Sequence, residues 1–522
     1  MKAIYSKLTL GLCLVHITTG LYGRSSDKRP LKETPMAQTT PTLARSTIYA
    51  HGALGLPLAV IGYPMAIWIP AHYAGSLGIG LATVGTILML ARLTDVLTDP
   101  IMGEISDRWV TPFGRRRPWL LVGMPIMIFG VYKLFMPPDE GVSLYYFLGY
   151  LTLFFLGATI IALPHRAWGA ELSVDYHQRS RVTAAREFYV LLGLLLAATV
   201  PMAVEILADG GGSVKSVFSI IFNDAKGAFT GELMEKEVVD RKTLSGPVLI
   251  GLAYTVIILL PVCIFVVLAV VKEPPTAGKR NVVPIREGLK YLWKNGPMRR
   301  VLIIVLMVTF GEAFRNAVSL FFIRDIVGVP TIGAAYFFYF AAGLGAIPFW
   351  LWLGRKIGKH YAFMSTLLLV ATVSAANLFL SYGDYLPFFL LFIVKGFCFG
   401  GLQFLPIAML ADVIDVDTAR SGGQRAGTYF SILGLTDKLA VAFGTGFSLN
   451  LVGLLGFDAA GGLAGSTEVG VLALRLVYCC GPIFFYGVAM AFIWGYPLTP
   501  ARHQRLRLRI ERKAARIAQL RQ

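Results

Sequence analysis

Residues 82–105 read ATVGTILMLARLTDVLTDPIMGEI. The stretch is long enough to cross a bilayer core of about 30 Å as a helix, yet Arg92, Asp95 and Asp99 interrupt its apolar run. Asp95 and Asp99 are four residues apart and share one helical face, and Arg92 lies one turn from Asp95. Ionisable groups inside a span cost several kcal/mol and usually face a partner or a solute pathway. The stretch therefore predicts a membrane-spanning helix that carries a charged site.

Two carboxylates on one helical face repel each other unless they share a proton or flank a cation. Their oxygens suit a hard cation such as Na⁺, and the hydroxyl of Thr98 can add another oxygen ligand. Pro100 donates no backbone hydrogen bond, so the carbonyl one turn before it is freed. We therefore predict a cation or proton site formed by Asp95, Asp99 and Thr98, with Arg92 beside it. The alternative is a salt bridge that only ties this helix to a neighbour.

The composition of the chain is that of a membrane protein. Of 522 residues, 56% are hydrophobic and 15% are charged, and the mean hydropathy is +0.65, whereas soluble domains carry about 25% charged residues. Apolar blocks of roughly 20–28 residues recur, each long enough to span a bilayer. We expect an all-α membrane protein with twelve transmembrane helices, at residues 48–74, 82–105, 118–136, 145–170, 183–205, 247–271, 301–323, 333–353, 362–381, 386–411, 427–455 and 472–496.

The charged residues gather in short segments between the apolar blocks. Lys and Arg follow the even-numbered spans, for example at 108–117 and at 355–359, whereas connections such as 75–80 and 137–143 contain neither. Because cytoplasmic loops are enriched in Lys and Arg, the pattern places both termini in the cytoplasm. It also explains the net charge of +18 without nucleic acid as a partner.

The spans and loops divide the chain into seven parts. We expect a cytoplasmic N-terminal segment at 1–45, the first five transmembrane helices at 46–205, an external loop insert at 206–246, the sixth transmembrane helix at 247–271, a cytoplasmic linker at 272–300, a C-terminal six-helix bundle at 301–498 and a basic amphipathic cytoplasmic tail at 499–522. Two of these parts have open alternatives. Residues 8–23 resemble a signal peptide, but Met36 is an equally good start, and the tail is either an interfacial helix or a frayed basic segment.

A weak internal repeat links the two halves of the chain. Glycines and basic residues follow the second span, and a similar pattern follows the eighth, six spans later. The residues expected in these conformational loops are Gly103, Asp107, Arg108, Arg115, Arg116, Gly354 and Arg355. Two pseudo-symmetric six-helix bundles suit alternating access, in which the halves rock around a site at the midplane.

Six motifs occur along the chain in a fixed order. They are Asp95-x-x-x-Asp99-Pro-x-x-Gly103, Gly114-Arg-Arg-Arg-Pro-Trp119, Gly169-Ala-Glu-Leu-Ser173, Arg179-x-Arg181-x-x-x-x-Arg186, Ala411-Asp-Val-Ile-Asp415 and Gly427-x-Tyr-Phe430. Together they resemble the glycoside–pentoside–hexuronide:cation symporters of the major facilitator superfamily, over about residues 46–498. The resemblance implies the major facilitator fold and cation-coupled transport of a sugar, glycoside or uronide.

The resemblance also implies roles for particular residues. Asp95 and Asp99 would bind the coupling cation, Na⁺, Li⁺ or H⁺, and no other cofactor is expected. Lys438 matches a lysine of the eleventh span near the cation site, and Arg186 matches an arginine of the fifth span near the sugar pocket. We expect a multi-pass monomer in the inner membrane, whose partners are the solute, the cation and membrane lipids.

The substrate side departs from the family pattern. Galactoside-binding members use acidic residues in the first and fourth spans, where this chain has Pro57 and Ala162, and Arg166 stands where a stacking aromatic is expected. Arg166, Arg186 and Arg315 indicate a cationic pocket for a solute that carries a carboxylate, such as a hexuronide, because the guanidinium fork suits bidentate capture of such a group.

Three alternatives stay open for the charges near the solute. Arg166 either contacts the solute or pairs with Glu171. Glu312 and Arg315, three residues apart in the seventh span, either pair with each other or face the solute. Lys395, in the tenth span, either faces the solute or pairs with Asp412.

Other classes of protein fit the sequence less well. An intramembrane enzyme needs a nucleophile beside a base, or metal ligands, and the histidines His51, His72 and His165 form no metal-binding pattern. A receptor needs a soluble output domain, and no segment between the spans is long enough. Within transport, an exporter or a lysolipid symporter of the same fold stays open.

Overall fold

The computed structural model describes residues 43–138, 141–173, 176–208, 245–273, 295–329, 332–421 and 426–496. The expected N-terminal segment to residue 42, residues 209–244 of the insert, residues 274–294 of the linker and the tail from residue 497 lie outside the described residues. In the described ranges the named elements are all helical. The prediction of an all-α membrane protein is confirmed.

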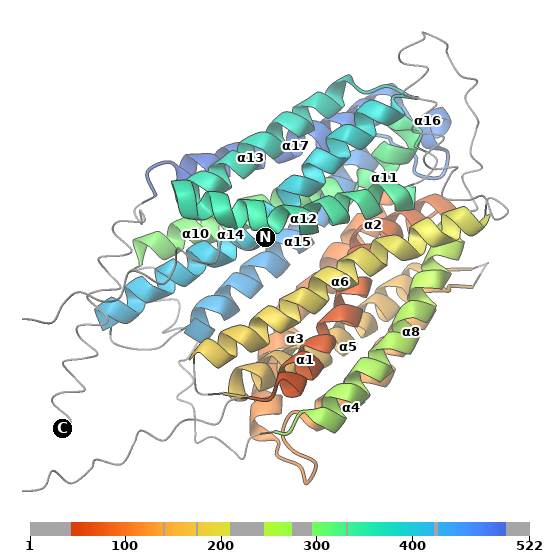
Figure 1. Cartoon of the computed structure of the whole chain (residues 1–522). Coiled ribbons are helices and arrows are strands. Elements are labelled where there is room, and N and C mark those ends of the chain that lie inside the picture. The colour runs from red at the N-terminus through yellow and green to blue at the C-terminus, as the bar shows by residue number, and fades with distance from the viewer. Residues whose placement is uncertain are drawn as a thin grey trace, which may run out of the picture. The chain divides into compact units, whose positions relative to one another are not determined.

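In the described residues of the N-terminal half the structure has seven α-helices (Figure 1). These are α1 (Arg45–Ala53), α2 (Gly55–Ala71), α3 (Leu81–Arg108), α4 (Arg117–Phe135), α5 (Leu144–Glu171), α6 (Tyr176–Ala208) and α8 (Ser245–Val270). A π-helical turn, η1 (His72–Ser76), continues α2. With η1, α1 and α2 form one candidate span over Arg45–Ser76, so the described residues of this half hold six candidate spans.

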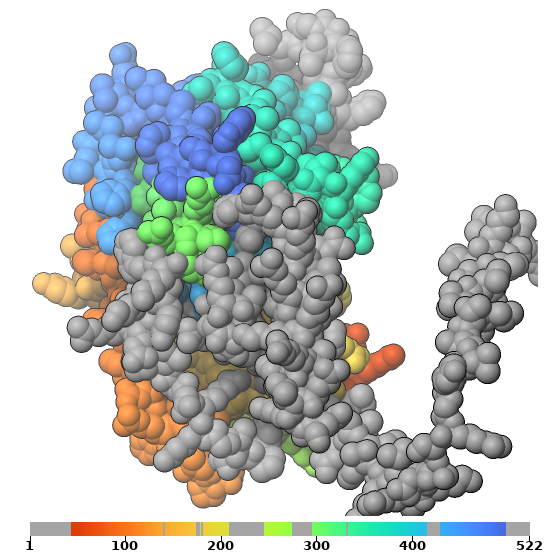
Figure 2. Space-filling model, turned by 90° about the vertical axis from the view of Figure 1, so that its left-hand side faces the viewer, coloured from red at the N-terminus to blue at the C-terminus, as the bar shows by residue number. Residues whose placement is uncertain are grey.

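The C-terminal half repeats this arrangement with more interruptions. Its elements are α10 (Gly296–Asn316), α11 (Ser319–Phe321), η2 (Phe322–Val327), α12 (Ile332–Ile357), α13 (Lys359–Ala376), η3 (Asn377–Phe379), α14 (Tyr385–Ser421), α15 (Ala426–Leu454), α16 (Gly462–Gly465) and α17 (Glu468–Ile493). Figure 2 shows the two halves from another side, with blue and teal residues of the C-terminal half above orange residues of the N-terminal half.

The seventh span is bent, which the sequence did not predict. Its two parts, Gly296–Asn316 and Ser319–Val327, meet at 44°. Val318 leaves the helical conformation at φ −103° and ψ 0°, and the hydroxyl of Ser319 donates to the carbonyl of Asn316 at 2.7 Å. A side chain that bonds a backbone carbonyl in this way is a usual cause of a kink. The described residues hold eleven unbroken candidate spans, or twelve when the bent pair counts as one.

Glycines let helices of the two halves approach closely. A Cβ atom added at Gly446 of α15 would lie 2.7 Å from the Cβ of Met89 on α3, and one at Gly453 would lie 2.6 Å from the nitrogen of Ala82. A Cβ atom added at Gly333 of α12 would lie 2.3 Å from the nitrogen of Met202 on α6. Lipid supplies no hydrophobic drive for helices to associate, so backbone contact of this kind is a main source of attraction.

The two ends of the bundle differ. We call the end that carries the loops at 109–116 and 358 the basic face, and the end that carries those at 77–80, 328–329 and 455–461 the opposite face. Between described residues, the hydrogen bonds and ion pairs that join the halves lie near the opposite face or in the middle of the bundle. Near the opposite face, Thr86 bonds Asn450 and Glu205 bonds Gly333. In the middle, Lys438 pairs with the carboxylates of α3. Within the part of the chain that the structure describes, the halves are therefore joined at the opposite face and in the middle of the bundle.

Candidate functional site

A charged cluster lies where α3 meets α15. The ammonium nitrogen of Lys438 is 2.6 Å from a carboxylate oxygen of Asp99 and 3.3 Å from one of Asp95. Asp95 is buried, with 2% of its side chain exposed, whereas Asp99 and Lys438 keep 21% and 26%. The structure thus brings the two predicted carboxylates together on one face and sets a lysine from the other half between them.

Two further side chains complete this cluster, which we call the coupling cluster. A guanidinium nitrogen of Arg92 is 3.5 Å from Asp95, and the guanidinium lies over the ring of Phe155 at 4.2 Å. The hydroxyl of Thr159, on α5, is 3.1 Å from an oxygen of Asp99 and 3.5 Å from one of Asp95. Two carboxylates and two cations balance in charge, which lowers the cost of burying them.

The threonine that reaches the carboxylates is not the predicted one. Thr98 was expected to supply a hydroxyl, but its hydroxyl oxygen is buried and bonds no described group. Thr98 directly precedes Asp99, and successive residues of a helix point about 100° apart, so its hydroxyl is turned away from the Asp99 carboxylate. Thr159 carried no signal in the sequence, because it is a neutral residue in an apolar span and its role depends on the packing of α5 against α3.

The donor set of the coupling cluster fits a hard monovalent cation. Carboxylate oxygens of Asp95 and Asp99 and the hydroxyl of Thr159 are the oxygen ligands that such ions prefer. The ammonium of Lys438 already lies between the carboxylates. A cation that binds both carboxylates has to displace this ammonium, because like charges at such distances repel.

The two predicted arginines near the solute have different surroundings. Arg186, on α6, forms an ion pair with its neighbour Glu187. Arg166, on α5, forms no ion pair or hydrogen bond with any described residue, and its side chain is exposed. The alternative in which Arg166 pairs with Glu171 is wrong, because Glu171 instead pairs with Arg115 at 2.7 Å.

Charged groups on three helices interact electrostatically with Arg166. The charges that act on its guanidinium are those of Arg186, Glu187, Asp99 and Asp437. Glu187 lies on α6, Asp99 on α3 and Asp437 on α15, so they come from both halves. Arg166 is therefore within electrostatic reach of charged groups from both halves.

In the seventh span, Glu312 and Arg315 pair with each other. Their side chains meet at 2.7 Å, and Arg315 is 1% exposed. Arg315 also donates to Asn316 at 3.1 Å, and the hydroxyl of Tyr486 donates to Glu312. The charge of Arg315 is thus neutralised inside the C-terminal half, which removes it from the predicted cationic pocket.

Lys395, on α14, does not pair with Asp412. That carboxylate receives the ammonium of Lys359 instead, at 2.6 Å. Lys395 is 3% exposed, and its ammonium lies 5.2 Å from the ring centre of Tyr339 and 5.4 Å from that of Phe392. Aromatic faces attract a cation, and among the described residues no carboxylate forms an ion pair with Lys395.

The basic-face loops of the first half form an ion-pair network. Arg116 is 3% exposed and donates to Ser106 at 2.9 Å, to Glu171 at 2.8 Å and to Asp107. Burial alone would lower the pKa of the Arg116 guanidinium, but the hydrogen bond and charge of Glu171, aided by Asp107, raise the pKa above its ordinary value. Arg116 therefore stays charged and joins α3, α4 and α5.

A carboxylate also caps the start of α4. The backbone N–H groups of Arg115, Arg116 and Arg117 donate to the two oxygens of Glu273 at 2.7–2.8 Å. Helix N-termini favour such anions. Gly114 has φ +116°, and an added Cβ would lie 2.7 Å from the Glu273 carboxylate, so only glycine fits here.

The remaining predicted loop residues have more ordinary surroundings. Arg108 pairs with Glu104 on its own helix at 2.5 Å, and Arg355 donates to the carbonyl of Leu351 at 3.3 Å. A Cβ atom at Gly103 would meet nothing within 4 Å, and one at Gly354 would make ordinary contact with Leu405 at 3.4 Å. Their packing therefore does not require glycine at either position.

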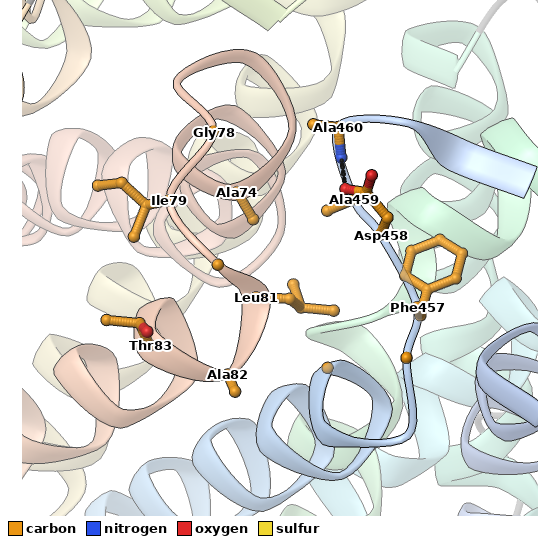
Figure 3. A pocket seen from close by; sticks show the side chains of 13 residues that line it. Ala74, Gly78, Ile79, Leu81, Ala82, Thr83, Phe457, Asp458, Ala459 and Ala460 are labelled. Atoms are coloured by element: carbon orange, nitrogen blue, oxygen red, sulfur yellow. Dashed lines mark hydrogen bonds between the residues drawn. The ribbon is translucent and has the colours of Figure 1, made fainter. Parts of the chain in front are cut away.

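A separate hollow of about 320 Å³ opens at the opposite face, between the start of α3 and the loop after α15 (Figure 3). Its one charged residue, Asp458, accepts the backbone N–H of Ala460 at 2.9 Å. Thr83 lines the hollow and stands twelve residues before Asp95, or about 18 Å along α3 at 1.5 Å per residue. The hollow is therefore distinct from the coupling cluster.

Comparisons with known proteins give one consistent family. Residues 49–500 match the family model of MFS/sugar transport proteins. The chain is 24% identical to the isoprimeverose transporter of Lactiplantibacillus pentosus, over 81% of this chain and 83% of the relative. It is 22% identical to the sodium-dependent lysophosphatidylcholine symporter 1 of Homo sapiens, over 82% of this chain and 79% of the relative.

The fold has solved counterparts. A bacterial homologue of the human lysosomal transporter Spinster, described as inward-facing and unoccupied, superposes with a TM-score of 0.58 at 14% identity, over 87% of this chain and 97% of that one. The predicted major facilitator fold is confirmed, and the match to transport proteins rules out the intramembrane enzyme. Because the family model covers most of its length, the chain belongs to the MFS/sugar transport protein family, as a multi-pass membrane transporter.

Proposed function

We propose that this transporter couples the downhill movement of a cation, Na⁺ or H⁺, to the uptake of a small polar solute such as a sugar, glycoside or uronide. The coupling cluster carries the proposal, because it combines one buried and one partly buried carboxylate of one half with a lysine of the other. Any cation that binds Asp95 and Asp99 changes what Lys438 contacts, so it acts directly on the junction between the halves. No cofactor beyond the cation is needed.

The cluster supports a cycle in which the cation binds before the solute. Without a cation, Lys438 holds the halves together through Asp99 at 2.6 Å. A bound cation neutralises the carboxylates and releases the ammonium, which favours solute binding between the halves. We assign the basic face to the cytoplasm, because cytoplasmic loops are rich in Lys and Arg. In this structure the halves are joined at the opposite face, so we interpret it as the state that opens toward the cytoplasm.

Transport by the purified protein in liposomes tests the proposal. Na⁺ and H⁺ gradients are imposed separately, and uptake of labelled glycosides and uronates is followed with each. Accumulation above the external concentration, dependent on one gradient, is the expected result. Accumulation driven by no cation gradient would overturn the coupling, and solute movement only outward would indicate an exporter.

A lysolipid is the second candidate solute. The relative in Homo sapiens is named a sodium-dependent lysophosphatidylcholine symporter and matches over 82% of this chain. The same liposomes, supplied with labelled lysophosphatidylcholine in place of sugars, separate the two solute classes. Competition between a uronate and the lysolipid would show whether they share one site.

Replacing Thr159 with valine is expected to weaken the cation affinity roughly 3- to 10-fold, the effect of one hydrogen bond of about 1 kcal/mol. Its hydroxyl reaches both carboxylates, at 3.1 Å and 3.5 Å. The matched control is Thr98→Val, because the Thr98 hydroxyl bonds no described group. The cation concentration that gives half-maximal uptake measures the effect, and equal values for the two variants would contradict the assignment.

We propose further that the solute carries a negative charge. Arg186, Arg315 and Lys438 are matched by carboxylates, whereas Arg166 has no ion pair with a described residue and lies among groups of both halves. A guanidinium with free donors suits a carboxylate or a phosphate. The earlier expectation of three cooperating arginines is thus reduced to Arg166.

Replacing Arg166 with glutamine is expected to raise KM for an anionic solute about 10-fold or more, because a charged hydrogen-bonded contact is worth about 1.5–3 kcal/mol. KM for a neutral glycoside should change little. The conservative variant Arg166→Lys keeps the charge and should retain part of the preference. Equal transport of neutral and anionic sugars by the unaltered protein would defeat the idea.

A further inference from the structure

A buried carboxylate joins the two halves at the opposite face. Glu205, near the end of α6, is 4% exposed. Its two oxygens lie 2.8 Å and 2.9 Å from the backbone nitrogen of Gly333, the second residue of α12. The N–H groups of a first helical turn lack partners within the helix, and the helix dipole favours a negative charge there. Glu205 of one half therefore caps a helix of the other.

The backbones are in contact at the same place. A Cβ atom added at Gly333 would lie 2.3 Å from the nitrogen of Met202, one turn before Glu205 on α6. The carboxylate can reach α12 only while this contact persists. Its hydrogen bonds are therefore made when the opposite face is closed and are lost when α6 and α12 separate there.

A second clasp at this face is neutral. Thr86 of α3 donates to Asn450 of α15 at 3.0 Å. Among the described residues, Glu205 is the one charged side chain that bonds across the halves near the opposite face. Charge-assisted hydrogen bonds are about twice as strong as neutral ones, so Glu205 contributes more than the neutral clasp to keeping this face closed.

We propose that Glu205 is a positioning residue that latches the opposite face of the transporter shut and sets how often it opens. Opening uncaps α12 and moves the carboxylate into water, so removal of its charge shifts the carrier toward the state open at the opposite face. The latch goes beyond the proposed solute and cation. It requires only that the halves separate at this face.

Distance measurements between spin labels test the latch without any solute. Tyr145, at the start of α5, and Phe379, at the end of η3, are 88% and 85% exposed near the opposite face of each half. Both are changed to cysteine in a protein from which the five native cysteines have been removed. The spin labels are expected to show a short distance when the opposite face is closed and a long one when it is open. In lipid nanodiscs, Glu205→Gln is expected to raise the ratio of the long-distance population to the short-distance population about 10-fold or more. Glu205→Asp should restore part of the short distance.

Two further measurements separate a latch from a merely structural role. Glu104→Gln is the matched control, because Glu104 is exposed and pairs with Arg108 on its own helix, and it should leave the distances unchanged. Loss of the latch in Glu205→Gln should make the state that is open at the opposite face more populated. The apparent KM for solute presented at that face should therefore fall. Folded Glu205→Gln and Glu205→Ala proteins with unchanged distances would overturn the proposal. Because no solute is needed, failure of the proposed symport would not affect the distances.

Discussion

Liposomes that contain the Asp99→Asn protein are expected to equilibrate the solute but not to concentrate it. Asparagine keeps the size of the side chain and removes its charge, so Lys438 loses its nearest carboxylate, at 2.6 Å. Asp99 is also one of the two carboxylates that bind the cation in the proposed cycle, and a charged contact of this kind is worth about 1.5–3 kcal/mol, so the cation affinity should weaken by about 10-fold or more. Uptake driven by a cation gradient should then fall to background.

Asp95→Asn is expected to have the same effect and to lower stability as well. Asp95 is 2% exposed and meets both Arg92 at 3.5 Å and Lys438 at 3.3 Å, so removing its charge leaves Arg92 without its ion-pair partner and Lys438 with Asp99 alone. Exchange of labelled for unlabelled solute, which needs no net cation movement, should survive in both variants. Glu104→Gln serves as the control for a lost surface carboxylate. If either asparagine variant still concentrated solute, the carboxylates would not be the coupling site.

The second large effect is expected at Glu312. Replacing it with alanine leaves Arg315, which is 1% exposed, without its ion-pair partner. An uncompensated buried charge costs about 3–5 kcal/mol, so the unfolding free energy of Glu312→Ala should fall by that amount. Reversible unfolding in detergent, followed by tryptophan fluorescence, measures the change.

The double variant Glu312→Ala with Arg315→Met distinguishes this explanation from a simple loss of packing. Removing both charges eliminates the buried cation, and replacing a buried ion pair by apolar groups is often nearly neutral. The double variant should therefore recover most of the stability lost by the single one. Tyr486→Phe should have a small effect, because Arg315 still neutralises the Glu312 carboxylate at 2.7 Å. A double variant as unstable as Glu312→Ala would show that the charge of Arg315 is not the cause.

The sequence predicts features that depend on one helix at a time. Asp95 and Asp99 are four residues apart in an apolar run, so their shared face follows from helical geometry alone. Glu312 and Arg315 are three residues apart, so helical geometry alone also predicts that they can pair. The other alternative was that they face the solute. Composition and block length likewise predict the twelve apolar spans, and the family match confirms the fold.

Features that depend on contacts between helices could not be derived in this way. Asp412 had a lysine candidate in Lys395, yet it pairs with Lys359 because α13 packs against α14 there. Thr159 and Glu205 are single polar residues whose partners lie 60 and 128 positions away. The bend in the seventh span arises from a hydroxyl that bonds a carbonyl one turn back, and a serine within a span does not by itself predict a kink.

The buried network around Arg116 has a consequence for biogenesis. Orientation by positive charge is decided as the chain inserts, before its helices pack, when Arg115 and Arg116 are hydrated and unpaired. In the folded protein, Arg115 and Arg116 bind Glu171, and their backbone N–H groups hold Glu273. On the proposed cytoplasmic orientation of the basic face, these arginines would perform two successive tasks. A substitution that keeps the topogenic charge, such as Arg116→Lys, would preserve the first and impair the second.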